Sequence, residues 1–135
     1  MPSLARLVKL ALAASLLLSA PLAGNPNAAP QPEGRVLRHV VLFKFKETTP
    51  AADKKKIEEA FRALPGKIRE IRGFEWGTNV SPENLSQGFT HCFVLTFASA
   101  PDRDAYLVHP AHKEFGNILG SALERALVVD FWAGR

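Results

Sequence analysis

The strongest constraint on this fold comes from predicted strands that are apolar on both faces. Residues 36–46 alternate between a face with His39, Val41, Phe43 and Phe45 and a face with Val40, Leu42 and Lys44. Residues 89–97 repeat this pattern. Because successive side chains of a strand point to opposite sides, helices on one side leave the other face wet, at roughly 1.5–3 kcal/mol for each large apolar side chain. The pattern therefore predicts a symmetric homodimer that covers its second sheet face with a partner copy.

Extended and helical patterns alternate along residues 36–132 in the order β-α-β-β-α-β. Strands are predicted at residues 36–46, 73–80, 89–97 and 127–132, and helices at 49–71 and about 110–125, with a short helix after Ser99. This order is the ferredoxin-like arrangement, an α+β fold whose helices lie on one face of a four-stranded antiparallel sheet. Thr49 and Ser99 are predicted to cap the helices that follow them. The alternation leaves open which sheet face turns toward the helices.

The N-terminal segment has the pattern of an export signal. Arg6 and Lys9 precede an apolar run at residues 10–20, followed by small residues and Pro21. This run is short for a membrane span, although an uncleaved anchor is the alternative interpretation. The predicted organisation is a signal peptide at 1–23, a flexible linker at 24–35 and one domain at 36–132. The mature protein is expected to be exported, periplasmic or secreted, and free of the membrane after cleavage.

Charge and cysteine content exclude several classes of protein. Without Arg6 and Lys9, 15 basic residues remain against 13 acidic ones, and no basic run is interleaved with aromatic residues. Nucleic acid is therefore not an expected partner. The chain has one cysteine, Cys92, so a disulfide within the chain is impossible. Its apolar strand context predicts an inert thiol.

The residues capable of chemistry are four histidines and one tyrosine: His39, His91, His109, His112 and Tyr106. A histidine can accept a proton near neutral pH, and a tyrosine hydroxyl can stabilise a developing oxyanion. Together they could remove a proton next to a carbonyl. The alternative is structural: histidines at strand starts satisfy backbone groups, and His109 before Pro110 forms the turn that begins a helix.

A metal or cofactor is not expected from these residues. His109 and His112 are three residues apart, but Pro110 between them disrupts a shared helix face. Asp130 and Glu75 could add oxygen ligands, yet the chain has no zinc-site spacing, acidic calcium loop or glycine-rich phosphate loop.

Several short segments occur in a fixed order along the domain: residues 39–44, 76–79, 88–91, 106–112 and 129–131. Together they resemble the stress-responsive A/B barrel (Dabb) family. The resemblance implies a dimeric α+β barrel. The family includes plant heat- and salt-stress proteins and a plant polyketide cyclase that uses a Tyr and a His of a Tyr-x-x-His-Pro-x-His segment in an aldol cyclisation. Those positions are Tyr106 and His112 here.

The resemblance also implies roles for the other candidates. His112 would be the general base and Tyr106 would orient or polarise a carbonyl, while His39, His91 and His109, with Trp76, would shape a binding pocket. Three functions stay open: an exported homodimeric stress-related or small-molecule-binding protein, a polyketide-cyclase-like enzyme acting on a small carbonyl compound, and, by fold analogy alone, an α+β barrel monooxygenase.

Overall fold

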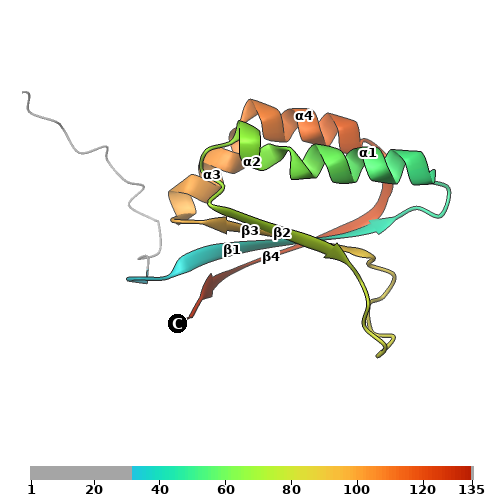
Figure 1. The fold of residues 1–135 in the computed structure, drawn as a ribbon, viewed down its shortest axis with the longest axis horizontal. Coiled ribbons are helices and arrows are strands. Elements are labelled where there is room, and N and C mark those ends of the chain that lie inside the picture. Colours follow the sequence, from blue (N-terminus) through green and yellow to red (C-terminus); the bar gives the residue numbers. More distant parts are fainter. Residues whose placement is uncertain (1–31, 135) are drawn as a thin grey trace, which may run out of the picture.

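Four antiparallel strands form a sheet in the order β2-β3-β1-β4, and the helices lie on one of its faces (Figure 1). The elements are β1 (Val36–Phe45), α1 (Ala51–Arg62), α2 (Leu64–Lys67), β2 (Gly73–Thr78), β3 (His91–Phe97), α3 (Ala100–Val108), α4 (Pro110–Leu119) and β4 (Leu123–Ala133). The computed structural model describes residues 32–134. The predicted signal peptide and most of the linker lie outside these residues. The ferredoxin-like α+β fold is confirmed.

The core lies between the helices and the face of the sheet that carries the aromatic residues. In β1, burial alternates strictly, with Leu37, His39, Val41, Phe43 and Phe45 buried and the intervening residues only half-buried. Phe61 of α1 stacks on Phe93 of β3, with ring centroids 4.2 Å apart. The sheet face that was ambiguous from the sequence is therefore settled: the face carrying His39 and His91 turns toward the helices.

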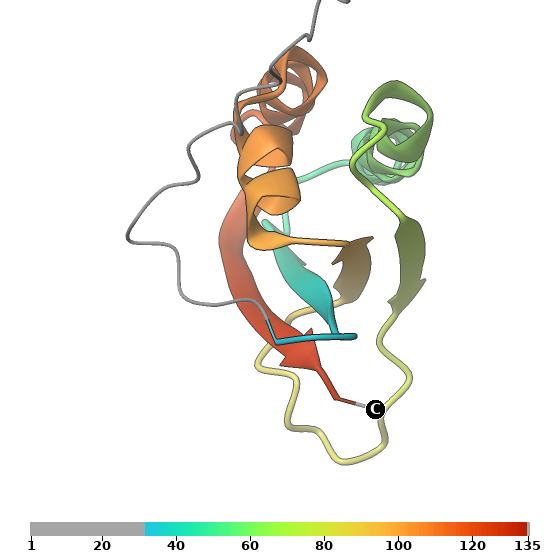
Figure 2. The same cartoon turned by 90° about the vertical axis from the view of Figure 1, so that its left-hand side faces the viewer.

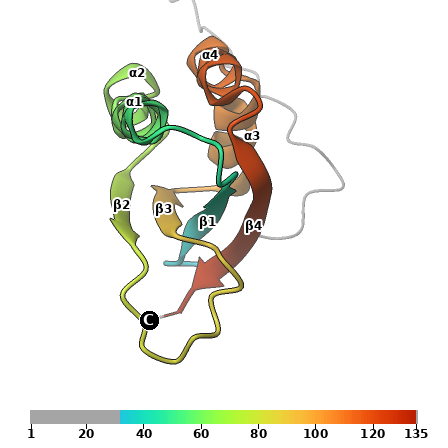
Figure 3. The same cartoon turned by 90° about the vertical axis from the view of Figure 1, so that its right-hand side faces the viewer.

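Two pairs of helices, which lie side by side in one layer, cover different parts of this face. End-on views show α1 and α2 above β2, and α3 and α4 above β4 (Figures 2 and 3). The loop that joins β2 to β3 extends beyond the opposite, helix-free face. That face is apolar at its centre, where Leu42, Cys92 and Val94 are half-buried, and at β4, where Leu127, Val129 and Phe131 are exposed by 45–49%. We call this surface the open face.

Two local predictions require correction. Thr49 does not cap α1: Pro50 is the cap residue, and the Thr49 hydroxyl donates instead to the carbonyl of Ala122 at 2.7 Å. The helix predicted at residues 110–125 ends at Leu119, because Gly120 adopts a positive φ of 51° that stops the helical path. Residues from Leu123 onward then join β4, which begins earlier than predicted.

One further local prediction holds. The Ser99 side chain accepts a hydrogen bond from the backbone N–H of Asp102 at 3.1 Å, so it caps α3 as expected. Among residues 32–134, no helix is both long enough and apolar enough to cross a membrane.

Candidate functional site

A cavity of about 450 Å³ opens between α3, α4 and the helix-facing side of β1 and β4. Its lining combines polar and apolar side chains: His39, Val41, Phe43, Phe61, Tyr106, Leu107, His112, Phe115, Leu119, Ala126, Val128 and Asp130. The cavity exists because β4 is an edge strand, so the helices cover it incompletely and Val128 stays 52% exposed. The volume falls within the range of small-molecule sites.

His39 is held at the polar end of this cavity by a carboxylate from the neighbouring strand. It pairs across the ladder with Asp130 of β4, which places both side chains on the same face. His39 Nδ1 lies 2.6 Å from Asp130 Oδ1. Because an ionised carboxylate can only accept a hydrogen bond, the hydrogen of this bond is on Nδ1 of His39. Arg103 of α3 donates to the other Asp130 oxygen, Oδ2.

Tyr106 lies between the two cavity histidines. Its ring centroid is 5.6 Å from that of His39 and 4.5 Å from that of His112. Burial, and then the charge of Asp130, raise the pKa of its hydroxyl well above the ordinary value, so the hydroxyl stays protonated. None of the hydrogen bonds found among residues 32–134 uses this hydroxyl. It is therefore available to donate to a ligand.

His112 has the features of a neutral base. Its Nδ1 lies 3.1 Å from the carbonyl oxygen of Leu107 and donates to it, which leaves the Nε2 lone pair available. Burial lowers the pKa of His112, with a smaller lowering from the charge of His39, against an opposing contribution of the Leu107 hydrogen bond. The imidazole is therefore unprotonated at neutral pH and able to accept a proton.

The structure does not bring all the predicted site residues together. His91 lies near the other end of the sheet, where Nε2 contacts Glu58 Oε1 of α1 at 2.8 Å and Nδ1 contacts the Thr90 hydroxyl at 2.8 Å. Trp76 stacks beside it, with centroids 6.4 Å apart. Neither residue lines the cavity that holds Tyr106 and His112.

His109 has a structural role in the helix that follows it. It is the N-cap of α4, and its Nδ1 accepts the backbone N–H of Ala111 at 3.1 Å. It does not line the cavity either. The structural alternative for His109, a turn that begins a helix, is thus what the geometry shows.

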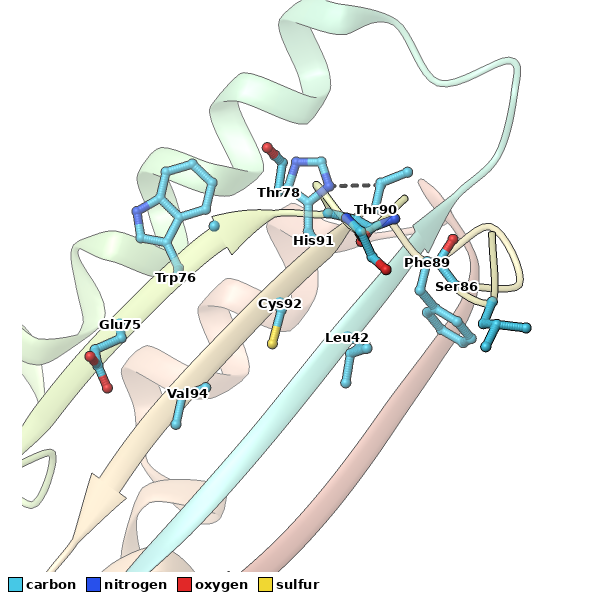
Figure 4. Close-up of a pocket in the computed structure, with 14 residues that line it drawn as sticks. Leu42, Glu75, Trp76, Thr78, Ser86, Phe89, Thr90, His91, Cys92 and Val94 are labelled. Carbon is cyan, nitrogen blue, oxygen red and sulfur yellow. Dashed lines mark hydrogen bonds between the residues drawn. The ribbon is translucent and has the colours of Figure 1, made fainter. Parts of the chain in front are cut away.

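A second cavity, of about 610 Å³, lies on the open face beneath the loop between β2 and β3. Figure 4 shows Leu42, Cys92 and Val94 projecting into it, while Trp76 and His91 project to the helix side of the sheet. Burial raises the pKa of the Cys92 thiol, so this cysteine stays protonated at neutral pH. The second cavity is lined by apolar side chains such as Leu42, Phe89 and Val94, together with polar ones that include Glu75 and His91.

The sequence analysis missed the roles of two residues: Asp130, which lines the first cavity, and Arg103, which contacts Asp130. Asp130 was considered only as a possible metal ligand, whereas it is the partner of His39. Arg103 was not considered, although it lies three residues before Tyr106 and so on the same helix face. The signal that could have found Asp130 is the register of β1 against β4, which pairs residues 39 and 130.

Among residues 32–134, no group of three or more His, Cys, Asp or Glu side chains could hold a metal ion. The cavity instead combines an unprotonated imidazole, a protonated phenol and an Asp–His pair. These groups can remove a proton from carbon and stabilise the resulting oxyanion.

Comparisons with known proteins agree with this architecture. Residues 37–133 match the family model described as "Stress responsive A/B Barrel Domain". The stress-response A/B barrel domain-containing protein HS1 of Arabidopsis thaliana is 37% identical over 95 residues, which cover 70% of this chain and 87% of that protein. Olivetolic acid cyclase of Cannabis sativa is 30% identical over 95 residues, covering 70% of this chain and 94% of that protein.

Solved structures extend the comparison. A hydroxynitrile lyase from Passiflora edulis matches with a TM-score of 0.69 at 26% identity, covering 73% of this chain and 94% of that one. A dimeric protein of unknown function and ferredoxin-like fold from Bacteroides fragilis matches with a TM-score of 0.59 at 31% identity, covering 71% and 94%. The structural neighbours thus include dimers of the same fold.

Proposed function

Because the chain belongs to the stress responsive A/B barrel domain family, we propose that it is a homodimer that binds a small, partly apolar carbonyl compound between α3, α4 and the sheet. The observation that carries this proposal is the contact of Tyr106 with His112, whose ring centroids are 4.5 Å apart in a cavity of about 450 Å³. The apolar part of the ligand would lie against Phe61, Phe115 and Leu119, which line the same cavity.

The proposed chemistry is proton removal from a carbon next to the carbonyl group. His112 Nε2 accepts the proton, and the electron pair of the broken C–H bond moves toward the carbonyl oxygen. The Tyr106 hydroxyl donates a hydrogen bond to that oxygen as its negative charge develops. The resulting enolate either takes the proton back or attacks a second carbonyl of the same molecule, which is the aldol step of a cyclase.

Two relatives support a carbonyl ligand without fixing its identity. One is named as a cyclase of olivetolic acid and the other as a hydroxynitrile lyase. A hydroxynitrile is the adduct of cyanide with a carbonyl compound, so both names point to carbonyl chemistry on one fold. The proposal for this chain is correspondingly a ligand class rather than a single substrate.

Proton exchange provides the test. Phenylacetone in heavy water would be followed by NMR for loss of the protons next to its carbonyl, with and without protein. We expect catalysed exchange, reduced roughly 10²–10⁴-fold by His112→Ala and similarly by Tyr106→Phe. Asn117→Ala, at an exposed position of α4 outside the cavity lining, is the matched control. Exchange that stays at the uncatalysed rate, or that survives His112→Ala, would contradict the enzymatic proposal.

A second function is supported by the open face: a stress-related protein whose activity is assembly alone. Leu127, Val129 and Phe131 form an exposed apolar stripe on β4. If assembly is the whole function, a stress-tolerance assay should respond to a charge placed in this stripe and not to His112→Ala. The opposite result would favour the cavity.

We also propose that the protein is exported, on the basis of the basic segment and apolar run that precede residue 24. Mass spectrometry of the protein recovered outside the cytoplasm should show a new N-terminus near the predicted boundary. Recovery of the full-length chain from the cytoplasm alone would contradict export.

A further inference from the structure

We propose that Arg103 is a positioning residue of the cavity, which acts through Asp130 to hold the His39 ring in one orientation, with its hydrogen on Nδ1. This inference deepens the proposed function, since the orientation of His39 matters at the polar end of the same cavity. Nothing in the family comparison assigns a role to Arg103.

The geometry forms a chain of contacts across three elements. Arg103 of α3 donates to Asp130 Oδ2 on β4, and Asp130 Oδ1 accepts from His39 Nδ1 of β1 at 2.6 Å. Both oxygens of Asp130 are therefore engaged, one by a permanent cation and one by the ring. The bond to Asp130 also fixes which nitrogen of His39 carries the hydrogen. His39 itself is only 5% exposed.

Charge balance explains why Arg103 matters. An arginine side chain remains protonated at any physiological pH, so the carboxylate of Asp130 already has a cationic partner. Without Arg103, the second oxygen of Asp130 loses this partner, and the carboxylate is free to turn away from His39 Nδ1.

The other charged and titratable groups around His39 fit this arrangement. Asp104 also contacts Arg103, with Nε to Oδ1 at 2.7 Å, but its side chain is 63% exposed, so solvent screens its charge. Tyr106 faces His39 from α3 and remains protonated, and His112 lies beyond Tyr106 on α4.

Nitrogen NMR of the histidine rings tests the inference on the ligand-free protein. In the wild type, the Nδ1 hydrogen of His39 should give a resolved signal, because its bond to Asp130 protects it from exchange with solvent. Arg103→Met keeps much of the aliphatic stem and removes the charge. We expect exchange of this hydrogen to become roughly tenfold faster or more, because the Asp130 carboxylate is no longer fixed. Arg103→Gln serves as a second charge-removing variant if the Met variant does not fold.

Two further variants separate charge from packing. Arg103→Lys restores a cation and should restore the slow exchange of the His39 hydrogen, whereas Asp104→Asn removes the other partner of Arg103 and should leave that exchange unchanged. Unchanged exchange in both charge-removing variants, a wild-type His39 without a protected Nδ1 hydrogen, or no rescue by Lys would each overturn the inference. Because these spectra need no ligand, they stand independently of the phenylacetone assay: absence of phenylacetone exchange with the expected spectra would reject only the proposed function.

Discussion

The two faces of one sheet use the same strands for different purposes. On the helix-covered face, Phe93 is 0% exposed, and both buried histidines have carboxylate partners. On the open face, the register neighbours of β1 are mostly aliphatic, and Phe131 remains 49% exposed. The helix-covered face completes itself within the chain and contains a polar site. The open face has an exposed apolar surface, which the proposed second copy would cover.

This contrast teaches where each kind of side chain is tolerated. Polar groups can enter the covered face only where another element supplies a partner, as Asp130 does for His39 and Glu58 for His91. The centre of the open face has no such partners for Leu42, Cys92 or Val94 and contains none of the proposed chemistry. The predictions below therefore treat one face as the site and the other as the interface.

The largest effect is expected from a charge on the open face. Val129→Glu should convert the proposed dimer into a monomer, because each copy would have to bury an unpaired carboxylate at a cost of several kcal/mol. The dissociation constant should rise by roughly 10³-fold or more. Sedimentation analysis over a range of concentrations measures it.

The matched control is Val108→Glu, the same change at a 65% exposed valine of α3, on the helix side of the sheet. It should leave the oligomeric state unchanged. A Val129→Glu protein that sediments like the wild type would show that the open face is not the interface.

A smaller effect is expected when the two faces are compared by how much a phenylalanine-to-alanine change on each lowers the free energy of unfolding. In the Val129→Glu background, Phe93→Ala should lower the free energy of unfolding by about 3–5 kcal/mol, because it empties a core position. Phe131→Ala in the same background should cost less than about 1 kcal/mol, since its ring is half-exposed. Urea unfolding measures both, and comparable losses would mean that the faces do not differ in burial as described.

The thiol of Cys92 reports on the open face in a third experiment. Cys92 lies at the centre of that face and lines its cavity (Figure 4). In the dimer it should react slowly with a bulky thiol reagent, and in Val129→Glu roughly tenfold faster, a change equivalent to about 1.4 kcal/mol of protection. Reaction at equal rates would argue that the partner covers some other surface.

The sequence allowed the strands and helices of this fold to be predicted, but not which residues of different elements contact one another. Alternation in residues 36–46 and 89–97 predicted both strands, because side-chain period follows directly from backbone geometry. It misled about the histidines: His39 and His91 both begin strands, but β1 and β3 run antiparallel. His91 therefore pairs with Phe43, about 13 Å along β1 from His39.

The site residues that the sequence analysis missed, Asp130 and Arg103, also depend on contacts between residues far apart in the chain. Asp130 meets His39 through a register set by the whole β1–β4 ladder, and Arg103 reaches Asp130 only once α3 packs beside β4. The motif that contains Tyr106 and His112 was visible because α3 and the start of α4 are contiguous in the chain. The local sequence thus identified Tyr106 and His112 as a candidate pair, whereas the contacts of Asp130 and Arg103 needed the tertiary structure.

The smallest expected effect is a pH dependence that arises on the covered face. In the unfolded chain His112 takes up a proton near its ordinary pKa of 6.5, whereas burial lowers that pKa in the folded protein. Between the two values the unfolded chain binds more protons, so the free energy of unfolding decreases as pH falls through this range. Compared with His112→Gln, the wild type should lose more stability on acidification from above 6.5, as measured by urea unfolding at a series of pH values. Parallel curves for the two proteins would mean that His112 keeps its ordinary affinity for protons, and the argument for a neutral base in the cavity would then fail.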